Sequence, residues 1–450
     1  MNDPNRFDPG AFGVFRVLDR SFDERSRTAV LDYALDDGPS FTETVTFETP
    51  PTGEMDMAAI RRALLHLHVA AGTSYYKAAA PPVVRVESGL SAAEVEFHRH
   101  LYDDGLREFA VENGLPVPRP VSIDAPSKPV ARVAPAVAER PGGLVVPIGG
   151  GKDSMVLIEA VRPLGPRLLA VNPHPLVSEL ARLAGLELLV VRRELSPALA
   201  GLNSSGALNG HVPITAIVSL IAVLGSAVYG YDTIAMAIER SASEESVWVD
   251  GAPVNHQYSK SLDFERLLTD LVATSVDPGL TYGSALRPYS ELSIARTFAA
   301  LTDYHSTVCS CNTAFRRSAG VGDRWCGDCA KCRFVALMLA PSMTPKDLTA
   351  LIGRDMFAEP DQIAGFAALM SAEGKPFECV GERRESAVAM RMLADLPAWS
   401  GTPVVAALAP AARALVTDRD ADELLRADPA LRFPRPDVAA AVDRFMVSVP

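Results

Sequence analysis

Three consecutive glycines followed by a lysine, an aspartate and a serine, Gly149 to Ser154, are the residues of this chain best suited to chemistry. Glycine has no Cβ, so the backbone can turn sharply and approach an anion closely. An apolar run, Leu144 to Ile148, precedes the glycines, and an apolar segment of helical periodicity follows to about Val161. Because a helix start presents free N–H groups and the positive end of its dipole, this order predicts a phosphate-binding turn. The alternative is a glycine turn between strand and helix with no ligand.

Closely spaced cysteines in the last third of the chain form a second candidate for chemistry. Cys309 and Cys311 are followed by Cys326, Cys329 and Cys332. Close pairs let two thiolates reach one metal from a tight turn, which favours a tetrahedral zinc site. We expect the last three cysteines to be joined by either Cys309 or Cys311, and four thiolates would make a structural site with no open position for water. Redox cysteines, or a cluster without metal, are the alternatives.

Polar residues also follow the predicted strands that alternate with helices after the glycine turn. These strands are expected at Arg167 to Val171, Glu187 to Val191 and Asp232 to Ala237. The alternation predicts a doubly wound, parallel α/β sheet, and such sheets bind ligands beyond the carboxyl ends of their strands. The candidates for ligand contacts here are Asn172, His174, Glu239, Arg240 and Ser241.

Two dense polar clusters lie further along the same region. They are Asn255-His256-Gln257-Tyr258-Ser259-Lys260 and Leu286-Arg287-Pro288-Tyr289-Ser290-Glu291-Leu292. A solvated loop would explain either one. Two clusters that each combine a base with an acid or an amide favour substrate contacts instead.

The elements that must position these residues fall into three predicted regions. Residues 1–140 form an N-terminal α+β domain, with period-two runs that predict an antiparallel sheet and a helix at Met57 to Ala71. Its end is rich in Pro, Ala and Val, which predicts a linker and a boundary near residue 140. Residues 141–343 form the α/β domain with the Cys cluster, and residues 344–450 form a C-terminal helical region.

The segment Tyr75-Tyr76-Lys77, shortly after Gly72, is unusual for a helix end. Two aromatic rings and a lysine after a glycine break are suited to lining a ligand pocket. Aromatic packing at the end of the helix explains them equally well.

Charge and hydropathy argue against a nucleic-acid-binding protein and against a membrane-spanning one. The net charge of the 450 residues is −12, which argues against nucleic-acid binding, since that requires a positive surface. The most apolar run, Val212 to Ala227, is interrupted by polar residues, proline and glycine, so it fits a buried helix better than a membrane span. The N-terminus lacks the apolar core of a signal peptide. We therefore expect a cytoplasmic protein with no nucleic-acid or membrane partner.

The turn from Gly149 to Ser154 resembles the S-G-G-x-D-S signature of the PP-loop ATP pyrophosphatases at five of six positions. Gly149 replaces the first serine of the signature, which removes one hydroxyl donor to the pyrophosphate. The resemblance implies the adenine nucleotide alpha hydrolase-like fold and cleavage of ATP between its α and β phosphates, with adenylation of a substrate oxygen. The Cys cluster is similar to the zinc site of some members, including the family that makes a deazaguanine nitrile.

Several stretches together resemble a narrower family, the UDP-N-acetylmuramoyl-L-alanyl-L-glutamate epimerases of bacterial peptidoglycan synthesis. Besides the glycine turn and the cysteines from Cys326, they are Leu65 to Ala78, Ile238 to Ala242 and Asn255 to Lys260. The resemblance covers most of the chain and is weakest after about residue 345. It implies an isomerase that uses ATP and Mg²⁺ to invert the terminal L-glutamate of a nucleotide-linked muramoyl dipeptide, for a cell wall on which cell shape and division depend.

The resemblance and the chemistry together suggest a role for each candidate. Lys152 would contact phosphate and Asp153 would contact Mg²⁺. Arg240 and Arg287 are suited to pairing with a carboxylate or phosphate of the substrate. The groups expected to bind pyrophosphate are Gly149, Gly150, Gly151 and Ser154. The candidates for the base that removes the α-proton are His211, His256, Tyr258 and Lys260.

Two other functions are compatible with the same motifs. Another PP-loop adenylating enzyme, such as an amide- or nitrile-forming ligase or a tRNA-base thiolase, would share the glycine turn, although the acidic charge disfavours tRNA. A nucleotide-binding regulator without turnover is the alternative from a different class, and the missing serine at Gly149 keeps it open. ATP consumption in the presence of substrate would separate these functions.

Overall fold

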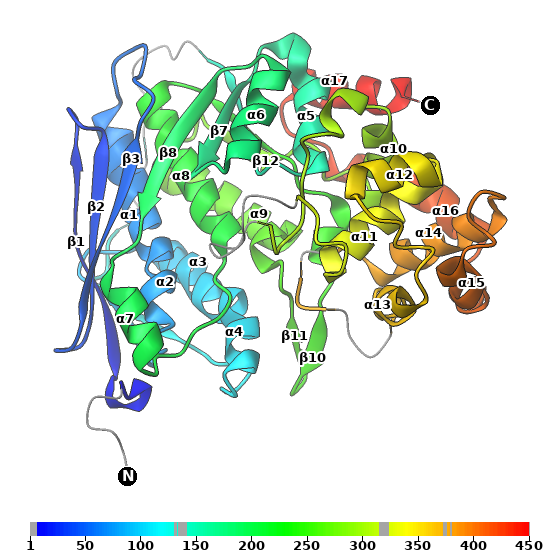
Figure 1. The fold of residues 1–450 in the computed structure, drawn as a ribbon. Coiled ribbons are helices and arrows are strands. Elements are labelled where there is room, and N and C mark those ends of the chain that lie inside the picture. Colours follow the sequence, from blue (N-terminus) through cyan, green and yellow to red (C-terminus); the bar gives the residue numbers. More distant parts are fainter. Residues whose placement is uncertain are drawn as a thin grey trace. The chain divides into compact units, whose positions relative to one another are not determined.

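The computed structural model describes residues 7–129, 133, 142–314, 324–371, 376–378 and 380–449. The backbone divides into two compact units, each assembled from separate stretches of the chain (Figure 1). The first comprises residues 1–144, 189–234 and 248–282, and the second comprises residues 145–188, 235–247 and 283–450. Both combine strands with helices, which confirms the α/β class. The boundary expected near residue 140 lies outside the described residues.

The first unit contains an antiparallel sheet formed by three long strands near the N-terminus, which lie side by side in Figure 1. These strands are β1 (Val14–Asp23), β2 (Thr28–Leu35) and β3 (Ser40–Phe47). Alternate residues of β3 are buried, as expected for a strand with one face on a core. The predicted antiparallel sheet is therefore confirmed.

Three shorter pairings extend this sheet. Strand β4 (Val83–Val86) pairs in parallel with β1 and with β5 (Ser122–Asp124), and β8 (Leu188–Glu194) pairs antiparallel with β3. The strand order is β8-β3-β2-β1-β4-β5. The sequence analysis missed β4 and β5, since both are too short to show a period.

Two long helices of the first unit pack against each other, α1 (Met57–Ala71) and α8 (Ile214–Tyr229). The bounds of α1 are those predicted, and its N–H groups are capped by the carboxylate of Asp56. Helix α8 is buried along most of its length, which confirms the interpretation of the most apolar run as a core helix. None of the helices in the described part of the chain has the length and apolar character needed to cross a bilayer.

The remaining helices of the first unit are short. Helix α3 (Ala92–Asp103) begins with a capping box, in which Ser91 and Glu94 bond to each other's backbone. Helix α7 (Ala198–Ser205) ends at Gly206, which adopts the left-handed conformation. The helices are α2 (Thr73–Tyr76), α3 (Ala92–Asp103), α4 (Arg107–Glu112), α7 (Ala198–Ser205) and α9 (Leu262–Leu271). A separate two-stranded sheet is formed by β10 (Val247–Val249) and β11 (Ala252–Val254).

The second unit is organised around β6 (Leu144–Pro147), whose residues are all buried. Strand β6 pairs in parallel with β7 (Arg167–Val171), as the alternating pattern predicts. The carboxyl halves of β9 (Thr233–Met236) and β12 (Thr281–Ser284) belong to this unit, in the order β12-β9-β6-β7. Helix α5 (Lys152–Val161) follows β6 after the glycine turn.

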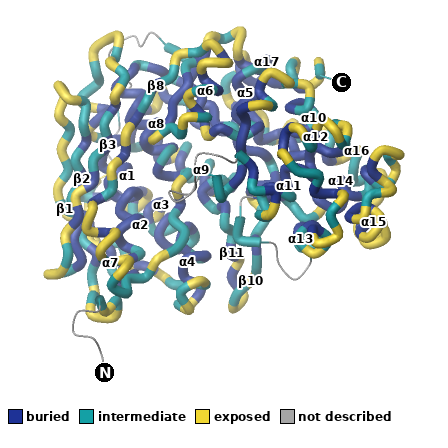
Figure 2. The backbone as a smooth tube through the Cα atoms, in the orientation of Figure 1, coloured by how far each residue is buried: buried dark blue, intermediate teal, exposed yellow. Residues whose placement is uncertain are grey.

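Helices make up most of the rest of the second unit. Helices α10 and α17 pack against α5, and α11 packs against α10, α13 and α14. Figure 2 shows α5 and α11 as mostly buried backbone. These helices are α6 (Pro175–Ala184), α10 (Glu291–Ala299), α11 (Ala330–Leu339), α12 (Pro345–Ile352), α13 (Ile363–Ala368), α14 (Arg383–Asp395), α15 (Pro403–Leu415), α16 (Asp418–Leu425) and α17 (Pro436–Ser448).

Candidate active site

The glycine turn of the second unit leaves the start of α5 open to a ligand. Gly150 has φ +88°, a left-handed conformation that glycine adopts without strain. Gly151 is the N-cap of α5, and no side chain caps the helix there. A Cβ at Gly151 would lie 2.9 Å from Ser310 Oγ, so a larger residue there would require the serine side chain to move. The N–H groups at the start of α5 are not capped by a side chain, so they keep the donors that the predicted phosphate-binding turn would use.

Lys152 at the first position of α5 is buried and paired with two acids. Its Nζ contacts Asp153 Oδ1 and Glu291 Oε2. Burial alone would lower the pKa of Lys152, but the charges of Asp153 and Glu291 outweigh it and raise that pKa. The ammonium group is therefore held charged inside the protein, where it can meet a phosphate.

Three carboxylates converge beside this lysine. Oxygen atoms of Asp153, Glu239 and Glu291 lie within 4.8 Å of one another. Burial raises the pKa of Glu291 to about 7, and although Lys152 opposes this rise, the other two carboxylates add to it. Carboxylate oxygens at this spacing are the donors that Mg²⁺ prefers, so the residues fit a bound magnesium ion.

The polar residues after β9 are positioned by the loop that precedes α10. The Arg287 guanidinium is buried and donates to the backbone oxygen of Glu239 over 2.7 Å. The N–H of Arg240 donates to Tyr289 O over 3.0 Å. Ser241 is fully buried, and its Oγ has no hydrogen-bond partner among the described residues. Arg287 thus supports the loop that carries Glu239, whereas Ser241 offers a free hydroxyl.

The residues after β7 lie in the turn that leads to α6. Asn172 lies directly after the strand with φ +47°, and His174 caps α6 by accepting from the N–H of Leu176. His174 therefore has a structural role, and Asn172 is placed by the turn that joins β7 to α6.

Two imidazole rings and a carboxylate converge in the first unit. His256 Nδ1 contacts Glu108 Oε2 of α4, and the rings of His211 and His256 have their centroids 4.5 Å apart. Nitrogen and oxygen atoms of the three side chains lie within 4.8 Å of one another. Burial, together with the neighbouring His256, lowers the pKa of His211 to about 4. His211 is therefore a neutral imidazole able to accept a proton.

Lys77 belongs to the same part of the first unit. Its Nζ contacts Asn209 Oδ1 and lies 3.4 Å from Gly210 O, two residues and one residue before His211. Burial lowers the pKa of Lys77. The residues of the Tyr75-Tyr76-Lys77 segment thus have different surroundings. Tyr75 packs between Tyr33 and Phe41, whereas Lys77 contacts the loop that leads to His211.

The other two base candidates lie beside the histidine pair in the sequence but make separate contacts. Tyr258 packs against Phe264, with ring centroids 6.0 Å apart, and burial raises the pKa of its hydroxyl. Lys260 Nζ donates to Gln257 Oε1 over 3.3 Å. Tyr258 is thus held as a neutral phenol, which makes it a poor base.

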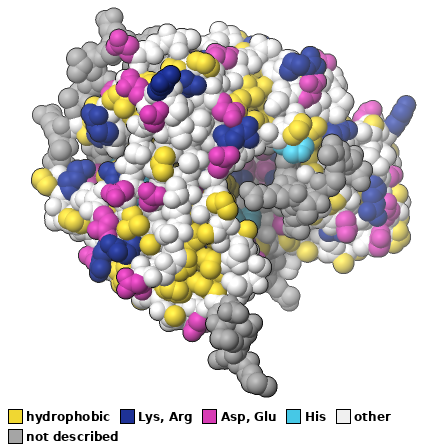
Figure 3. All heavy atoms as spheres, turned by 60° about the vertical axis from the view of Figure 1, so that its left-hand side comes forward, with side chains coloured by type: hydrophobic (Ala, Val, Ile, Leu, Met, Phe, Trp, Pro, Cys, Tyr) yellow, Lys and Arg dark blue, Asp and Glu magenta, His cyan; other side chains and the backbone are white. Residues whose placement is uncertain are grey.

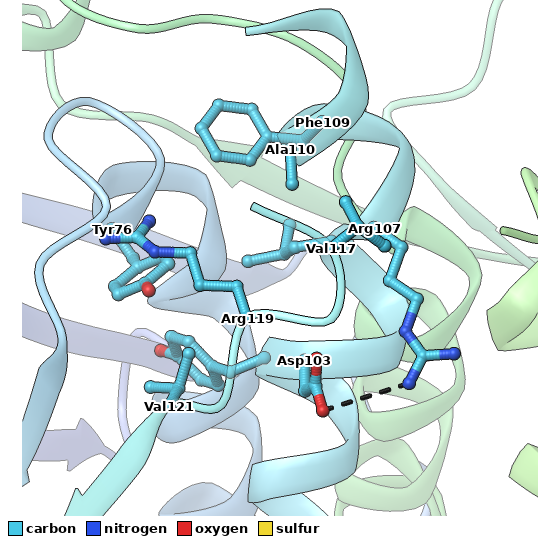
Figure 4. Close-up of a pocket in the computed structure, with 10 residues that line it drawn as sticks. Tyr76, Asp103, Arg107, Phe109, Ala110, Val117, Arg119 and Val121 are labelled. Carbon is cyan, nitrogen blue, oxygen red and sulfur yellow. Dashed lines mark ion pairs between the residues drawn. The ribbon is translucent and has the colours of Figure 1, made fainter. Parts of the chain in front are cut away.

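A small pocket of the first unit lies next to Tyr76 (Figure 4). Arg107 and Asp103 form an ion pair on one side of it, and Arg119 reaches across toward Tyr76. The Tyr76 hydroxyl has no hydrogen-bond partner among the described residues. The two tyrosines therefore differ in their surroundings, since Tyr76 lines a pocket and Tyr75 packs in the core.

Four of the cysteines form a cluster in the second unit. The sulfur atoms of Cys311, Cys326, Cys329 and Cys332 lie within 4.8 Å of one another, and backbone N–H groups point at three of them over 3.3–3.5 Å. Cys309 lies outside, since its Sγ donates to Arg324 O over 2.6 Å. All five are free thiols. The structure selects Cys311 as the fourth member, and the donor set fits tetrahedral zinc.

Comparisons with known proteins place the chain in a family. The MurL N-terminal domain matches residues 6–285, and the MurL C-terminal domain matches residues 307–423. A UDP-N-acetyl-alpha-D-muramoyl-L-alanyl-L-glutamate epimerase of Salinispora tropica is 43% identical over 407 residues, which cover 88% of each chain. The chain belongs to this epimerase family.

Two further members of the epimerase family agree over the same extent. The epimerase of a Micromonospora species is 41% identical, covering 88% of this chain and 90% of its own. The epimerase of Xanthomonas oryzae pv. oryzae is 40% identical, covering 89% and 90%. The family predicted from the sequence is therefore confirmed.

Sequence reasoning missed two buried acids that belong to these clusters. Glu291 was noted only as part of a polar cluster, and Glu108 was not noted at all. Both are buried, at 1% and 5% exposure, and both pair with a base far away in the sequence. The signal that could have identified these two acids is a charged residue on an otherwise buried helix face, because a buried charge requires a partner.

Proposed function

We propose that this chain inverts the terminal L-glutamate of UDP-N-acetylmuramoyl-L-alanyl-L-glutamate, using ATP to activate the glutamate carboxylate. The observation that carries the proposal is family membership over 88% of the chain together with an uncapped helix start beside a buried lysine. The relatives' names supply the substrate. The phosphate-binding turn, which has the PP-loop signature, supplies a reason for ATP.

The chemistry explains why activation is needed. Removing the α-proton beside a free carboxylate would create a dianion, so the proton is very weakly acidic. Attack of a carboxylate oxygen on the α-phosphate forms an acyl adenylate and releases pyrophosphate. The adenylated carbonyl accepts the electrons of the broken C–H bond, and a proton returns to the other face. Water then cleaves the acyl–phosphate bond and releases AMP and the dipeptide product, in which the glutamate is now D.

The second unit is suited to the adenylation. The N–H groups of Gly150, Gly151 and Lys152 at the start of α5 can bind the phosphates, and the Lys152 ammonium is available to the same anion. Asp153, with Glu239 and Glu291, would hold Mg²⁺, which offsets phosphate charge and helps pyrophosphate leave.

The first unit is suited to proton transfer. His211 is neutral and can accept the α-proton, while Glu108 fixes the orientation of His256 through Nδ1. Glu108 is thus a positioning residue, and His211 and His256 are the proposed proton carriers. The low pKa of Lys77 and its position beside the histidine loop make it a further group able to contact substrate.

The Cys cluster is proposed as a structural zinc site. Four thiolates leave no open position for water, so the metal would support folding rather than catalysis. It would tie the segment around Cys311 to the start of α11.

The proposal is tested by incubating the protein with ATP, Mg²⁺ and the L-glutamate substrate in deuterated water. AMP is followed by chromatography, and the α-position of glutamate by mass and chiral analysis. AMP together with deuterated D-glutamate is the expected result. AMP with neither label nor inversion would indicate a ligase or hydrolase with another acceptor, and nucleotide binding without AMP would indicate a regulator.

Matched variants assign the two half-reactions. Asp153→Asn should abolish AMP formation, whereas His256→Asn and Glu108→Gln should form AMP but lose about 100-fold or more in deuterium incorporation. Asp395→Asn and His100→Asn make the same chemical changes at partly exposed ion pairs and should behave as wild type. Full deuterium incorporation by His256→Asn would exclude the histidine pair as proton carriers.

A further inference from the structure

Two histidines and a glutamate of the first unit form a group of potential metal ligands that is separate from the Cys cluster and from the acids of the glycine turn. Nitrogen and oxygen atoms of Glu108, His211 and His256 lie within 4.8 Å of one another. Ligand atoms that are each about 2.1 Å from one zinc ion lie about 3.4 Å apart in a tetrahedral shell. Small rotations of the three side chains would therefore bring them onto one ion.

Helix α4 carries Glu108 and also holds the two loops that carry the histidines. Arg107 Nη1 donates over 2.9 Å to the backbone oxygen three residues before His256. Asn113 Nδ2 donates over 2.9 Å to the backbone oxygen two residues before His211. The three side chains are thus brought together by hydrogen bonds in which they take no part, so their arrangement does not depend on a metal.

The chemistry of these side chains favours a transition metal over magnesium. Neither ring nitrogen of His211 forms a hydrogen bond within the part of the chain that the structure describes, and a neutral imidazole keeps one lone pair. Two imidazoles and a carboxylate are typical ligands of zinc and its neighbours, whereas Mg²⁺ takes oxygen ligands. Both histidines are partly exposed, so an ion and its water ligands have access from solvent.

The charges around this group favour reversible binding. Glu112 of α4 adds a second carboxylate, because a Cβ at Gly210 would lie 3.0 Å from its Oε2. Lys77 and Lys260 add two ammonium groups that act on His211. The carboxylates attract a dication and the ammonium groups repel it. We therefore expect weaker metal binding here than at the four thiolates of the Cys cluster.

We propose that Glu108, His211 and His256 bind a first-row transition-metal dication such as Zn²⁺, and that the bound metal blocks proton transfer. The lone pair of His211 that would accept the α-proton is the one that it would donate to the metal, so the two exclude each other. Adenylation uses groups of the second unit and should continue. The effect on epimerisation rests on the proposed function, whereas metal binding does not.

Binding is tested with Co²⁺, a coloured substitute for Zn²⁺, added to nucleotide-free protein whose Cys cluster already holds zinc. The wild-type chain should bind one Co²⁺ with a visible d–d absorption and without a thiolate charge-transfer band. His211→Asn and Glu108→Gln should each bind it about 10-fold or more weakly. An absence of this absorption in the wild type, or unchanged binding by both variants, would overturn the proposal.

A matched control and a measurement without variants complete the binding test. His100 contacts Glu96 and Asp104 on the partly exposed side of α3, so His100→Asn removes a histidine between carboxylates elsewhere in the unit and should bind Co²⁺ as wild type. X-ray absorption of the wild-type chain should show imidazole ligands on the bound Co²⁺. If they are missing, the proposal is wrong, whether or not the variants fold.

The effect on the reaction is measured with Zn²⁺ in the presence of ATP, substrate and excess Mg²⁺. Deuterium incorporation should fall in proportion to the sites that Zn²⁺ occupies, as judged by displacement of Co²⁺, while AMP formation continues. Full deuterium incorporation with the metal bound would show that the metal does not block proton transfer. If the metal-free enzyme produced no D-glutamate, the proposed function would fail, and the Co²⁺ result would still decide the metal site.

Discussion

Lys152 is charged and buried, and it also has a role in the proposed chemistry. Lys152→Met would leave Glu291 buried without its cation, and breaking such a pair typically costs about 3–5 kcal/mol. The pKa of Glu291 is already raised by burial and would rise further, so protonation would relieve part of the cost at acidic pH. A carboxyl with a raised pKa binds a proton more tightly in the folded state, and the variant should therefore lose stability relative to the wild type as pH rises from 5 to 8.

Urea unfolding across this pH range checks the prediction, and a double variant separates stability from chemistry. Lys152→Met with Glu291→Gln removes both charges and should recover most of the stability without recovering AMP formation. Lys346→Met, at an exposed position, is the matched control and should change neither. A stability difference between the single variant and the wild type that does not change with pH would show that Glu291 is not the group left uncompensated.

At the scale of elements, two neighbouring glycines in the turn between β6 and α5 should respond differently to substitution, although the sequence does not distinguish them. A Cβ at Gly149 would meet no atom within 4 Å, and its φ is not positive. Gly150 has φ +88°, where a side chain costs about 1–2 kcal/mol. Gly149→Ser, which restores the serine of the PP-loop signature, should fold as wild type and bind ATP at least as tightly. Gly150→Ser should lose stability and ATP affinity, as thermal unfolding and calorimetry would show.

Helices α1 and α3 of the first unit bury histidines that must stay neutral. His66 Nδ1 lies 3.2 Å from His98 Nε2, and both rings are inaccessible to water. Burial lowers the pKa of His66 and of His68 to about 3 and that of His98 well below its usual value. Since the unfolded chain takes up these protons below about pH 6.5, stability should fall by about 1.4 kcal/mol per pH unit for each histidine as pH decreases toward 3.

Unfolding in urea between pH 7.5 and pH 5 measures this dependence. His98→Gln keeps a polar atom near the position of Nε2 but cannot be protonated, so its loss of stability on acidification should be smaller by about one third, the share of one histidine in three. The exposed-face variant His100→Gln should retain the wild-type dependence. Equal slopes for wild type and His98→Gln would mean that His98 is protonated in the folded state.

The elements were more predictable than the contacts between them. The bounds of α1, the three N-terminal strands and the strand before the glycine turn follow from local periodicity, which is visible in single stretches. The Cys cluster follows from local spacing, except that Cys309 and Cys311 are both close enough in sequence and only the fold excludes Cys309. Glu108 and Glu291 could not be assigned, because their partners are 148 and 139 residues away.

At the scale of the whole molecule, stretches of the two compact units alternate along the chain. The amino-acid sequence shows no boundary where the chain changes from one unit to the other. Each unit is built from three stretches, because the strands after residue 188 and residue 248 return to the first unit. The distribution of charged side chains does not distinguish the two units either. On the face drawn in Figure 3, the described Lys and Arg side chains are scattered among Asp and Glu side chains. Stability of each unit must therefore be measured separately.

Removing the proposed zinc should act on one unit only. The four thiols of the Cys cluster all belong to the second unit, at the start of α11, whose neighbours are α10, α13 and α14. Without metal the thiols lose their common partner, so chelation or Cys329→Ser should loosen these helices. Hydrogen exchange should accelerate in α11 and its neighbours, while α1 and α8 of the first unit keep their protection. The control variant Cys309→Ser lies outside the cluster and should retain full zinc content. If Cys309→Ser lost its zinc while Cys311→Ser still held the metal, Cys309 would be the fourth ligand instead of Cys311.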